Sequence, residues 1–352
     1  MDALTWHNLL TQQPGTRPQP NRGSEGLHPV TDADNDVESV VPWFLSQWFP
    51  SPMVDVVVEA LAGRIEVNRQ GLLGAKEILG IDGPYGVGKT SMIFALSRRL
   101  YPSYVSKPLA GEVPTWAPVP GVVHDRVPIM WVQLQAHASL KVLYGSILDF
   151  LRFPIHGTGG VLASRVFRAL DRFDVRLMIL DDVHKLRETQ QASRDIIDAL
   201  HTLNTNVGER GGTLCLVGSD MTNRTLLHHP QIDSRLKTYH LDPFEITTNE
   251  GKRAWQGFLR GVEDLSLPYL PGQQSGFLSR VLPAYLYART QGHMQDVQQL
   301  LKEGFRHAVT NGTPMDRDVF DQIPLSERAS RAEALLRATK LSLTPTKARS
   351  VS

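Results

Sequence analysis

One eight-residue segment constrains this chain more than any other. Residues 83–90 read Gly-Pro-Tyr-Gly-Val-Gly-Lys-Thr and match the phosphate-loop pattern G-x-x-x-x-G-K-[ST] at every fixed position. An apolar run at 78–81 precedes the segment, and a helical pattern at 91–100 follows it. Glycines let successive backbone N–H groups converge on phosphate oxygens, where side chains would collide. The sequence therefore predicts a strand, a phosphate loop and a helix that together bind a nucleotide.

The residue types in this loop also predict how the nucleotide is held. We expect Lys89 to reach the β and γ phosphates and the Thr90 hydroxyl to ligate Mg²⁺. The positive end of the helix that begins near Gly88 adds to the attraction for phosphate. The expected nucleotide-binding residues are Gly83, Pro84, Gly86, Val87, Gly88, Lys89, Thr90 and Ser91. ATP and Mg²⁺ are the expected cofactors.

The wider apolar pattern predicts the fold class. Four short apolar runs, separated by helical patterns, lie at 78–81, 129–132, 175–180 and 213–218. This alternation is typical of an α/β domain, with a parallel sheet flanked by helices. The segment 102–127 carries five prolines, so we expect a long loop or insertion there. After Phe244 the expected strands stop, and helical patterns at 248–263, 276–291 and 293–310 predict a small C-terminal helical lid.

Composition divides the chain further and excludes several classes. The 352 residues carry 37 Lys and Arg against 36 Asp and Glu, which excludes a histone-like polycation. The single cysteine, Cys215, excludes an intramolecular disulfide framework and a Cys-rich zinc site. No apolar run approaches the roughly 18 residues of a membrane span. The first residues lack the charged region of a signal peptide, so we expect a soluble cytoplasmic protein. The expected parts are a flexible N-terminal arm over 1–40, a nucleotide-binding core over 41–245, the lid over 246–323 and a basic tail over 324–352.

Acidic and polar residues follow two of the apolar runs. Asp181 and Asp182 end the third run, so we expect Asp181 to hold Mg²⁺, through water, and Asp182 to polarise a water against the γ-phosphate. The alternative is that both aspartates cap the next helix. Ser219 follows the fourth run and is placed to contact the γ-phosphate or the lytic water, although a helix cap explains it equally well.

An arginine further along the chain completes the expected catalytic set. Ser234-Arg235 resembles the segment from which oligomeric ATPases of the AAA+ type supply an arginine to a neighbour's γ-phosphate. A planar, permanently charged guanidinium suits charge that is spread over phosphoryl oxygens. The alternative is an ordinary surface arginine. The expected catalytic residues are Lys89, Asp181, Asp182, Ser219 and Arg235.

Over about 48–320, the order of these motifs resembles the TniB/TnsC group of AAA+ ATPases. These are target-selection regulators of Tn7-like and related transposons. The similarity is carried by GPYGVGKT (83–90), MILDDVHKL (178–186), LCLVGSD (214–220), HPQIDSRLKTYHLDPF (229–244) and TQGHMQDVQQLLKEGFRHAVTNG (290–312). The phosphate loop alone is shared by many unrelated proteins, and the combination is far more specific.

The resemblance implies a role in DNA transposition and recombination. Such proteins bind ATP between subunits and assemble as rings or helical filaments on duplex DNA. They link a TniQ-like target-recognition protein to a DDE transposase of the TnsB/TniA kind, and they do not cut DNA themselves. The resemblance also implies that Ser219 acts as the first sensor of the γ-phosphate and that Arg235 acts in trans.

The sequence departs from the family pattern at two positions. Many relatives have Glu where this chain has Asp182. The shorter side chain withdraws the carboxylate by about one bond length, so we expect slow, regulatory ATP hydrolysis. Related lids often carry an arginine where this chain has Gln295. A neutral amide cannot replace that charge, so we expect weaker closure of the lid on ATP.

Contact with DNA requires several basic residues on one surface. The candidates are Lys141, Arg152, Lys185, Arg187 and Arg194. Each of them taken alone is also explained as a solvated surface charge. The basic tail is expected to bind DNA or to reach the transposase.

Three other functions are compatible with a phosphate loop. The nearest is an AAA+ replication initiator or helicase loader, although too few residues follow the lid to hold a clear helix-turn-helix domain. The second is a P-loop phosphotransferase that modifies a small molecule, which would gain nothing from Arg235 acting on a neighbour. The third is a nucleotide-dependent switch that binds only protein.

Overall fold

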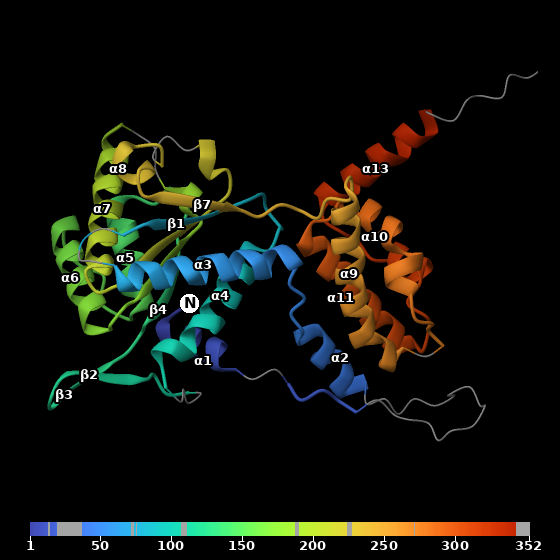
Figure 1. Ribbon diagram of the computed structural model, residues 1–352, viewed down its shortest axis with the longest axis horizontal. Coiled ribbons are helices and arrows are strands. Elements are labelled where there is room, and N and C mark those ends of the chain that lie inside the picture. Colours follow the sequence, from blue (N-terminus) through green and yellow to red (C-terminus); the bar gives the residue numbers. More distant parts are fainter. Residues whose placement is uncertain are drawn as a thin grey trace, which may run out of the picture. The chain divides into compact units, whose positions relative to one another are not determined.

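The computed structural model describes residues 1–12, 15–19, 37–71, 74, 76–106, 111–186, 190–223, 227–270 and 272–342 (Figure 1). The chain divides into two compact units. The first unit consists of Met1–Gln13 and Met53–Leu241, and the second of Pro14–Pro52 and Asp242–Ser352. None of the described helices combines the length and the apolar character needed to cross a membrane.

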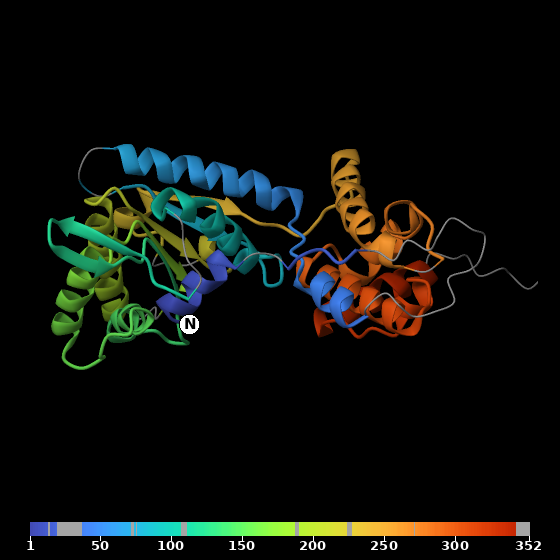
Figure 2. The same ribbon diagram turned by 90° about the horizontal axis from the view of Figure 1, so that it is seen from below.

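A five-stranded parallel sheet forms the centre of the first unit. Its strands are β1 (Ile78–Asp82), β4 (Ile129–Gln133), β5 (Leu177–Asp181), β6 (Thr213–Val217) and β7 (Leu236–His240), in the order β4-β5-β6-β1-β7. Every residue of β1, β5 and β6 is buried, which explains why these strands are nearly continuous apolar runs. Helices lie on both faces of the sheet, as Figures 1 and 2 show, so the predicted fold class is confirmed.

Six of the described helices of this unit alternate with the strands of the sheet along the chain. They are α3 (Pro52–Gln70), α4 (Lys89–Tyr104), α5 (Leu140–Phe150), α6 (Gly159–Arg172), α7 (Gln190–Gly208) and the short α8 (Pro230–Asp233). The segment expected to be an irregular loop contains an antiparallel hairpin, β2 (Thr115–Val119) and β3 (Val122–Asp125). Most of its residues are exposed, so alternation between buried and polar positions could not mark these strands in the sequence.

The prediction of a flexible arm over 1–40 is wrong for residues 3–11, which form a helix. Helix α1 (Ala3–Thr11) packs into the core of the first unit, where Trp6 is only 1% exposed. The Trp6 ring lies 5.1 Å from that of Trp131 in β4 and 6.2 Å from that of Phe94 in α4. Removing these rings from water is favourable enough to order a short helix that its polar neighbours did not predict.

The second unit is helical. Its main elements are α2 (Val37–Ser46), α9 (Asn249–Ser266), a π-helical turn (Phe277–Val281), α10 (Pro283–Thr290), α11 (Met294–Asn311), α12 (Arg317–Asp321) and α13 (Glu327–Ser342). The Phe44 ring of α2 stacks 3.8 Å from Phe305 of α11. Residues 41–52, expected in the nucleotide-binding core, therefore belong to the helical unit instead. Pro283 starts a new helix within the single helix expected over 276–291, because its ring cannot continue the preceding one.

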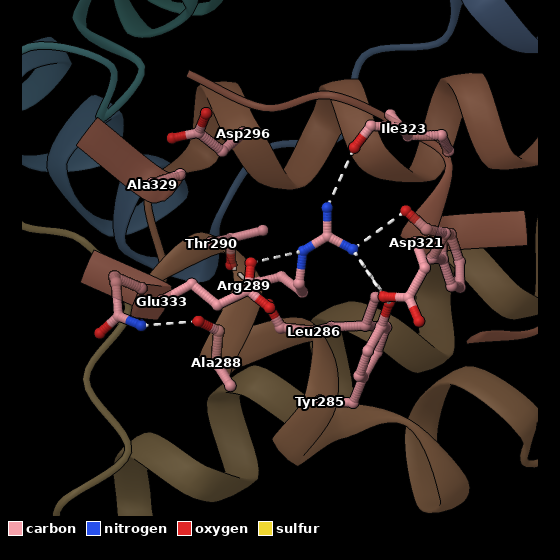
Figure 3. Close-up of polar contacts among 12 residues, drawn as sticks. Tyr285, Leu286, Ala288, Arg289, Thr290, Asp296, Asp321, Ile323, Ala329 and Glu333 are labelled. Carbon is pink, nitrogen blue, oxygen red and sulfur yellow. Dashed lines mark hydrogen bonds and ion pairs between the residues drawn. The ribbon is translucent and has the colours of Figure 1, made fainter. Parts of the chain in front are cut away.

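A buried arginine joins three helices of this unit, as Figure 3 shows. Arg289 of α10 is only 7% exposed. Its Nη1 donates to the Tyr285 hydroxyl (3.0 Å) and to the Asp321 carboxylate (3.1 Å). Its Nη2 donates to the Ile323 carbonyl (3.0 Å), and its Nε lies 3.0 Å from the Glu333 carboxylate. One side chain thus ties α10 to the end of α12 and to α13.

A second ion pair holds the start of α13. Arg328 pairs with Asp296 of α11, whose side chain is buried. Part of the expected basic tail is therefore a helix, with one of its basic residues neutralised against the helical unit. Lys347 and Arg349 lie outside the described residues.

We predict that Arg289→Ala destabilises α12 and α13 by about 3 kcal/mol, because it leaves the buried carbonyl groups of Phe320 and Ile323 without their donor. Hydrogen exchange of the α12 and α13 amides measures this effect. Arg331→Ala is the matched control, since Arg331 is 80% exposed and 3.8 Å from Glu327. Equal exchange in the two variants would contradict a clamping role for Arg289.

Candidate functional site

The phosphate loop joins the end of β1 to the start of α4. Gly83, Gly86 and Gly88 have φ values of 155°, 79° and 102°, which favour glycine. A Cβ on Gly83 would overlap the carbonyl oxygen of Leu241. Val87 is 2% exposed and anchors the loop in the core. The loop is thus held open by its glycines beside the positive N-terminal end of α4, a geometry that suits phosphate groups.

Lys89, the first residue of α4, lies inside this loop. Its Nζ donates to the carbonyl oxygens of Gly83 (2.7 Å) and Pro84 (2.9 Å) and to the hydroxyl of Ser219 (2.9 Å). Burial lowers the pKa of Lys89, and the carboxylates of Asp181 and Asp82 oppose this shift. The ammonium group therefore lies where a phosphate chain would contact the loop, beside Ser219, which lies two residues after the end of β6.

Asp181 is the last residue of β5 and lies beside Lys89. Its Oδ1 accepts the Asp182 N–H (2.8 Å), and its Oδ2 accepts Nε1 of Trp131 (3.1 Å). Burial, followed by the neighbouring Asp182 carboxylate, raises the pKa of Asp181. A divalent cation would relieve this cost of holding negative charge, and the Asp181 carboxylate and Thr90 hydroxyl supply the hard oxygen donors that Mg²⁺ prefers. These two residues would hold the metal.

Asp182 adopts a left-handed backbone conformation, with φ 60°. Its Oδ2 accepts Nζ of Lys185 (2.6 Å) and Nε2 of Gln133 (3.1 Å). Burial raises the pKa of Asp182, but the hydrogen bonds from Lys185 and Gln133 outweigh it, so the pKa is lowered. The carboxylate is therefore ionised at neutral pH and is engaged by two side chains.

Two residues without an expected role complete the site. The Ser219 N–H donates to Nδ1 of His184 (3.3 Å), and Nε2 of His184 lies 3.1 Å from the Tyr85 hydroxyl. The Tyr85 ring in turn lies 5.5 Å from Nζ of Lys89. In the sequence, the only signal for the contacts of His184 and Tyr85 was the spacing of Asp182 and His184. That spacing indicates no particular chemistry. The pair links the phosphate loop to the ends of β5 and β6.

Arg235 lies at the opposite edge of the sheet. Its carbonyl accepts the N–H of Ile78, the first residue of β1, whereas the loop begins after Asp82 at the other end of that strand. At about 3.3 Å per residue, the Arg235 backbone is therefore about 20 Å from Gly83 along the sheet. The structure brings together four of the five expected catalytic residues and places Arg235 outside their site.

Two of the expected DNA-binding residues are paired with carboxylates. Arg152 pairs with Asp2 of the N-terminal segment (2.6 Å), and Lys185 is held by Asp182. Lys141 on α5 and Arg194 on α7 are exposed, and Arg187 lies outside the described residues. In the helical unit, Gln295 is exposed on α11.

Comparisons with known proteins agree with this geometry. Residues 47–246, more than half of the chain, match the family model described as "Bacterial TniB protein". No curated protein matches the sequence. Among solved structures, Cdc6p from Pyrobaculum aerophilum is similar, with a TM-score of 0.54, 15% identity, and coverage of 88% of this chain and 79% of that chain. At this identity the similarity establishes the fold alone, which is that of AAA+ ATPases.

Two further structures are more distant. The ORC2 protein from Aeropyrum pernix has a TM-score of 0.45 and 15% identity, and covers 86% of this chain and 74% of that one. The RuvB branch migration motor from Thermotoga maritima has a TM-score of 0.43 and 13% identity, and covers 80% and 72%.

We predict that Gly83→Ala destabilises the first unit by at least about 2 kcal/mol. The new methyl group would overlap the Leu241 carbonyl oxygen, and the positive φ at this position is unfavourable for alanine. Gly63→Ala in α3 is the matched control. No atom lies within 4 Å of a Cβ there, and alanine favours a helix. Urea unfolding of both variants tests the prediction, and wild-type stability in Gly83→Ala would show that the loop is not held as described.

Proposed function

The chain belongs to the TniB family, and we propose that it is an AAA+ ATPase that assembles on duplex DNA in DNA transposition. In this role it links a TniQ-like target-recognition protein to a DDE transposase. The observation that carries the proposal is the separation of Arg235 from the phosphate loop within one subunit. A site with four of its five catalytic groups in place is completed when a second copy supplies the fifth.

Each residue at the carboxyl edge then has a role in ATP hydrolysis. Lys89 contacts the β and γ phosphates, and the loop N–H groups bind the remaining phosphate oxygens. Thr90 and Asp181 would hold Mg²⁺, which would supply positive charge to neutralise the phosphates. Asp182 orients and polarises the attacking water, and Ser219 contacts the γ-phosphate.

Arg235 acts in trans in this proposal. Repeated head-to-tail contacts between subunits would place the amino edge of one sheet against the carboxyl edge of the next, and such contacts generate rings or helical filaments. The guanidinium would then stabilise charge on the transferred phosphoryl group. A phosphotransferase that acts as a monomer would have no use for this arrangement.

Hydrolysis is slow in this proposal for two reasons that reinforce each other. The Asp182 side chain is shorter than the glutamate of many relatives, and its carboxylate is already engaged by Lys185 and Gln133. A water molecule must compete with both partners before the carboxylate can orient it. In such an assembly, the rate of hydrolysis would set how long the protein stays on DNA. Slow turnover would therefore set the period in which transposition can occur.

We predict that Lys89→Ala and Arg235→Ala each abolish ATP hydrolysis, with the arginine variant losing about 10³-fold in rate while it still binds ATP. An equal mixture of the two variants, with duplex DNA, should regain about a quarter of wild-type activity, because each site meets one random neighbour. The measurement is phosphate release at fixed total protein. If the mixture stays inactive, Arg235 does not act on a neighbour's nucleotide.

We also predict that Lys185→Ala raises the rate of hydrolysis a few-fold, because it removes the stronger partner of the Asp182 carboxylate. Steady-state phosphate release measures the rate. Lys252→Ala, an exposed lysine on α9, is the control and should leave the rate unchanged. A reduced rate in Lys185→Ala would mean that Lys185 supports catalysis instead of restraining Asp182.

A further inference from the structure

A pocket in the first unit lies at the amino edge of the sheet, away from Lys89. Its volume is about 450 Å³, and helices α3 and α4 form one side. Arg126, Arg176 and Arg210, which precede β4, β5 and β6, line the other side, and Arg69 of α3 also lines it. Because parallel strands begin at the same edge, three arginines that are distant in sequence meet in one place.

A buried carboxylate fixes two of these arginines. Asp174 has a side chain only 3% exposed and accepts Nε of Arg126 (2.8 Å) and Nε of Arg176 (2.7 Å). The Nη1 group of Arg126 donates to the carbonyl of Tyr104, and that of Arg176 to the carbonyl of Arg210. Their positions are therefore set before any ligand arrives, which lowers the entropic cost of binding.

These contacts do not use all the donors. Each guanidinium has five N–H groups, and the contacts of Arg126 and of Arg176 to Asp174 and to the carbonyls engage three of them. Arg210 pairs with the exposed Asp171, and Arg69 pairs with the half-exposed Glu66. Four arginines against three carboxylates leave the pocket with a net positive charge.

We propose that this pocket binds a phosphorylated small molecule. Planar guanidinium groups bind phosphate through paired hydrogen bonds, and several of them around one pocket suit an anion with more than two oxygens. The volume lies in the range of pockets that hold small ligands, so it has room for an organic group beside the phosphate. Ile65 and Leu100 provide an apolar wall for that group.

The Tyr104 hydroxyl is a further donor in the pocket. Burial raises the pKa of Tyr104, so the hydroxyl stays protonated at neutral pH. It can therefore donate a hydrogen bond to an anionic oxygen.

The pocket is separate from both parts of the proposed catalytic site. The phosphate loop follows the carboxyl end of β1, at the other edge of the sheet. Arg235 precedes β7, three strands from the β5 strand that follows Arg176, which is about 14 Å at the usual spacing. Arg235 is not among the described residues that line the pocket, and its Nη1 donates to the Gln231 carbonyl (3.0 Å), so this inference does not depend on the role of Arg235.

Calorimetric titration with inorganic pyrophosphate tests the proposal. The full chain carries Lys89→Ala, which weakens binding of pyrophosphate to the phosphate loop. We expect binding that the added pair Arg69→Gln and Arg210→Gln weakens at least 10-fold. Neither arginine contacts the buried Asp174, so the fold should be retained. Tyr104→Phe should weaken binding a few-fold, and Arg99→Gln, on α4 and paired with Glu59, should have no effect.

Competitors identify the source of the phosphate. Displacement of pyrophosphate by ADP but not by duplex DNA supports a small molecule, whereas displacement by DNA alone would assign the pocket to a nucleic-acid backbone and overturn the proposal. Equal displacement by succinate would show a pocket for any anion and would also overturn it. So would the absence of binding, or binding that survives the loss of Arg69 and Arg210.

Discussion

All five strands of the central sheet run in the same direction, and the chemistry of the molecule depends on this. In a parallel sheet, the residues that follow the strands lie at one edge, and the residues that precede the strands lie at the other. The phosphate loop and Ser219 follow β1 and β6, and Asp181 is the last residue of β5, so they meet at the carboxyl edge. Arginines precede β4, β5, β6 and β7, so they gather at the amino edge. The sheet thus separates the edge that carries Asp181 and Asp182 from an arginine-rich one.

This separation explains why a single copy is incomplete in the proposed function. A rigid five-residue strand cannot bring Arg235 to the phosphate loop of its own subunit. A second copy can, provided that opposite edges of two sheets meet. Dependence of hydrolysis on assembly then follows from strand direction, without any movement of the arginine within its own unit.

The sequence predicted the parts of the molecule that local patterns encode. Glycine spacing marked the loop at 83–90, and apolar runs marked four strands. It failed for α1, whose order depends on Trp6 meeting Trp131 across 125 positions, and for the hairpin at 115–125, which has little buried surface to leave a pattern. The sequence also did not identify β7. This is one of the two outermost strands of the sheet, and its residues are half-buried or exposed.

The same limit applies to the site. Residue types predicted Lys89, Asp181, Asp182 and Ser219, because a phosphate loop requires such partners. The restraint of Asp182 by Lys185 and the contacts of His184 with Tyr85 depend on the left-handed turn at Asp182, which no sequence pattern encodes. The arginine pocket was missed because its members are separated by tens of residues and converge only through the sheet.

The central claim is that ATP bound between subunits drives assembly on duplex DNA. Electron microscopy of the purified protein with duplex DNA, in the presence of a non-hydrolysable ATP analogue, ADP or no nucleotide, tests it most directly. We predict rings or filaments on DNA with the analogue only, and their loss in Arg235→Ala. Monomers under every condition would contradict the claim.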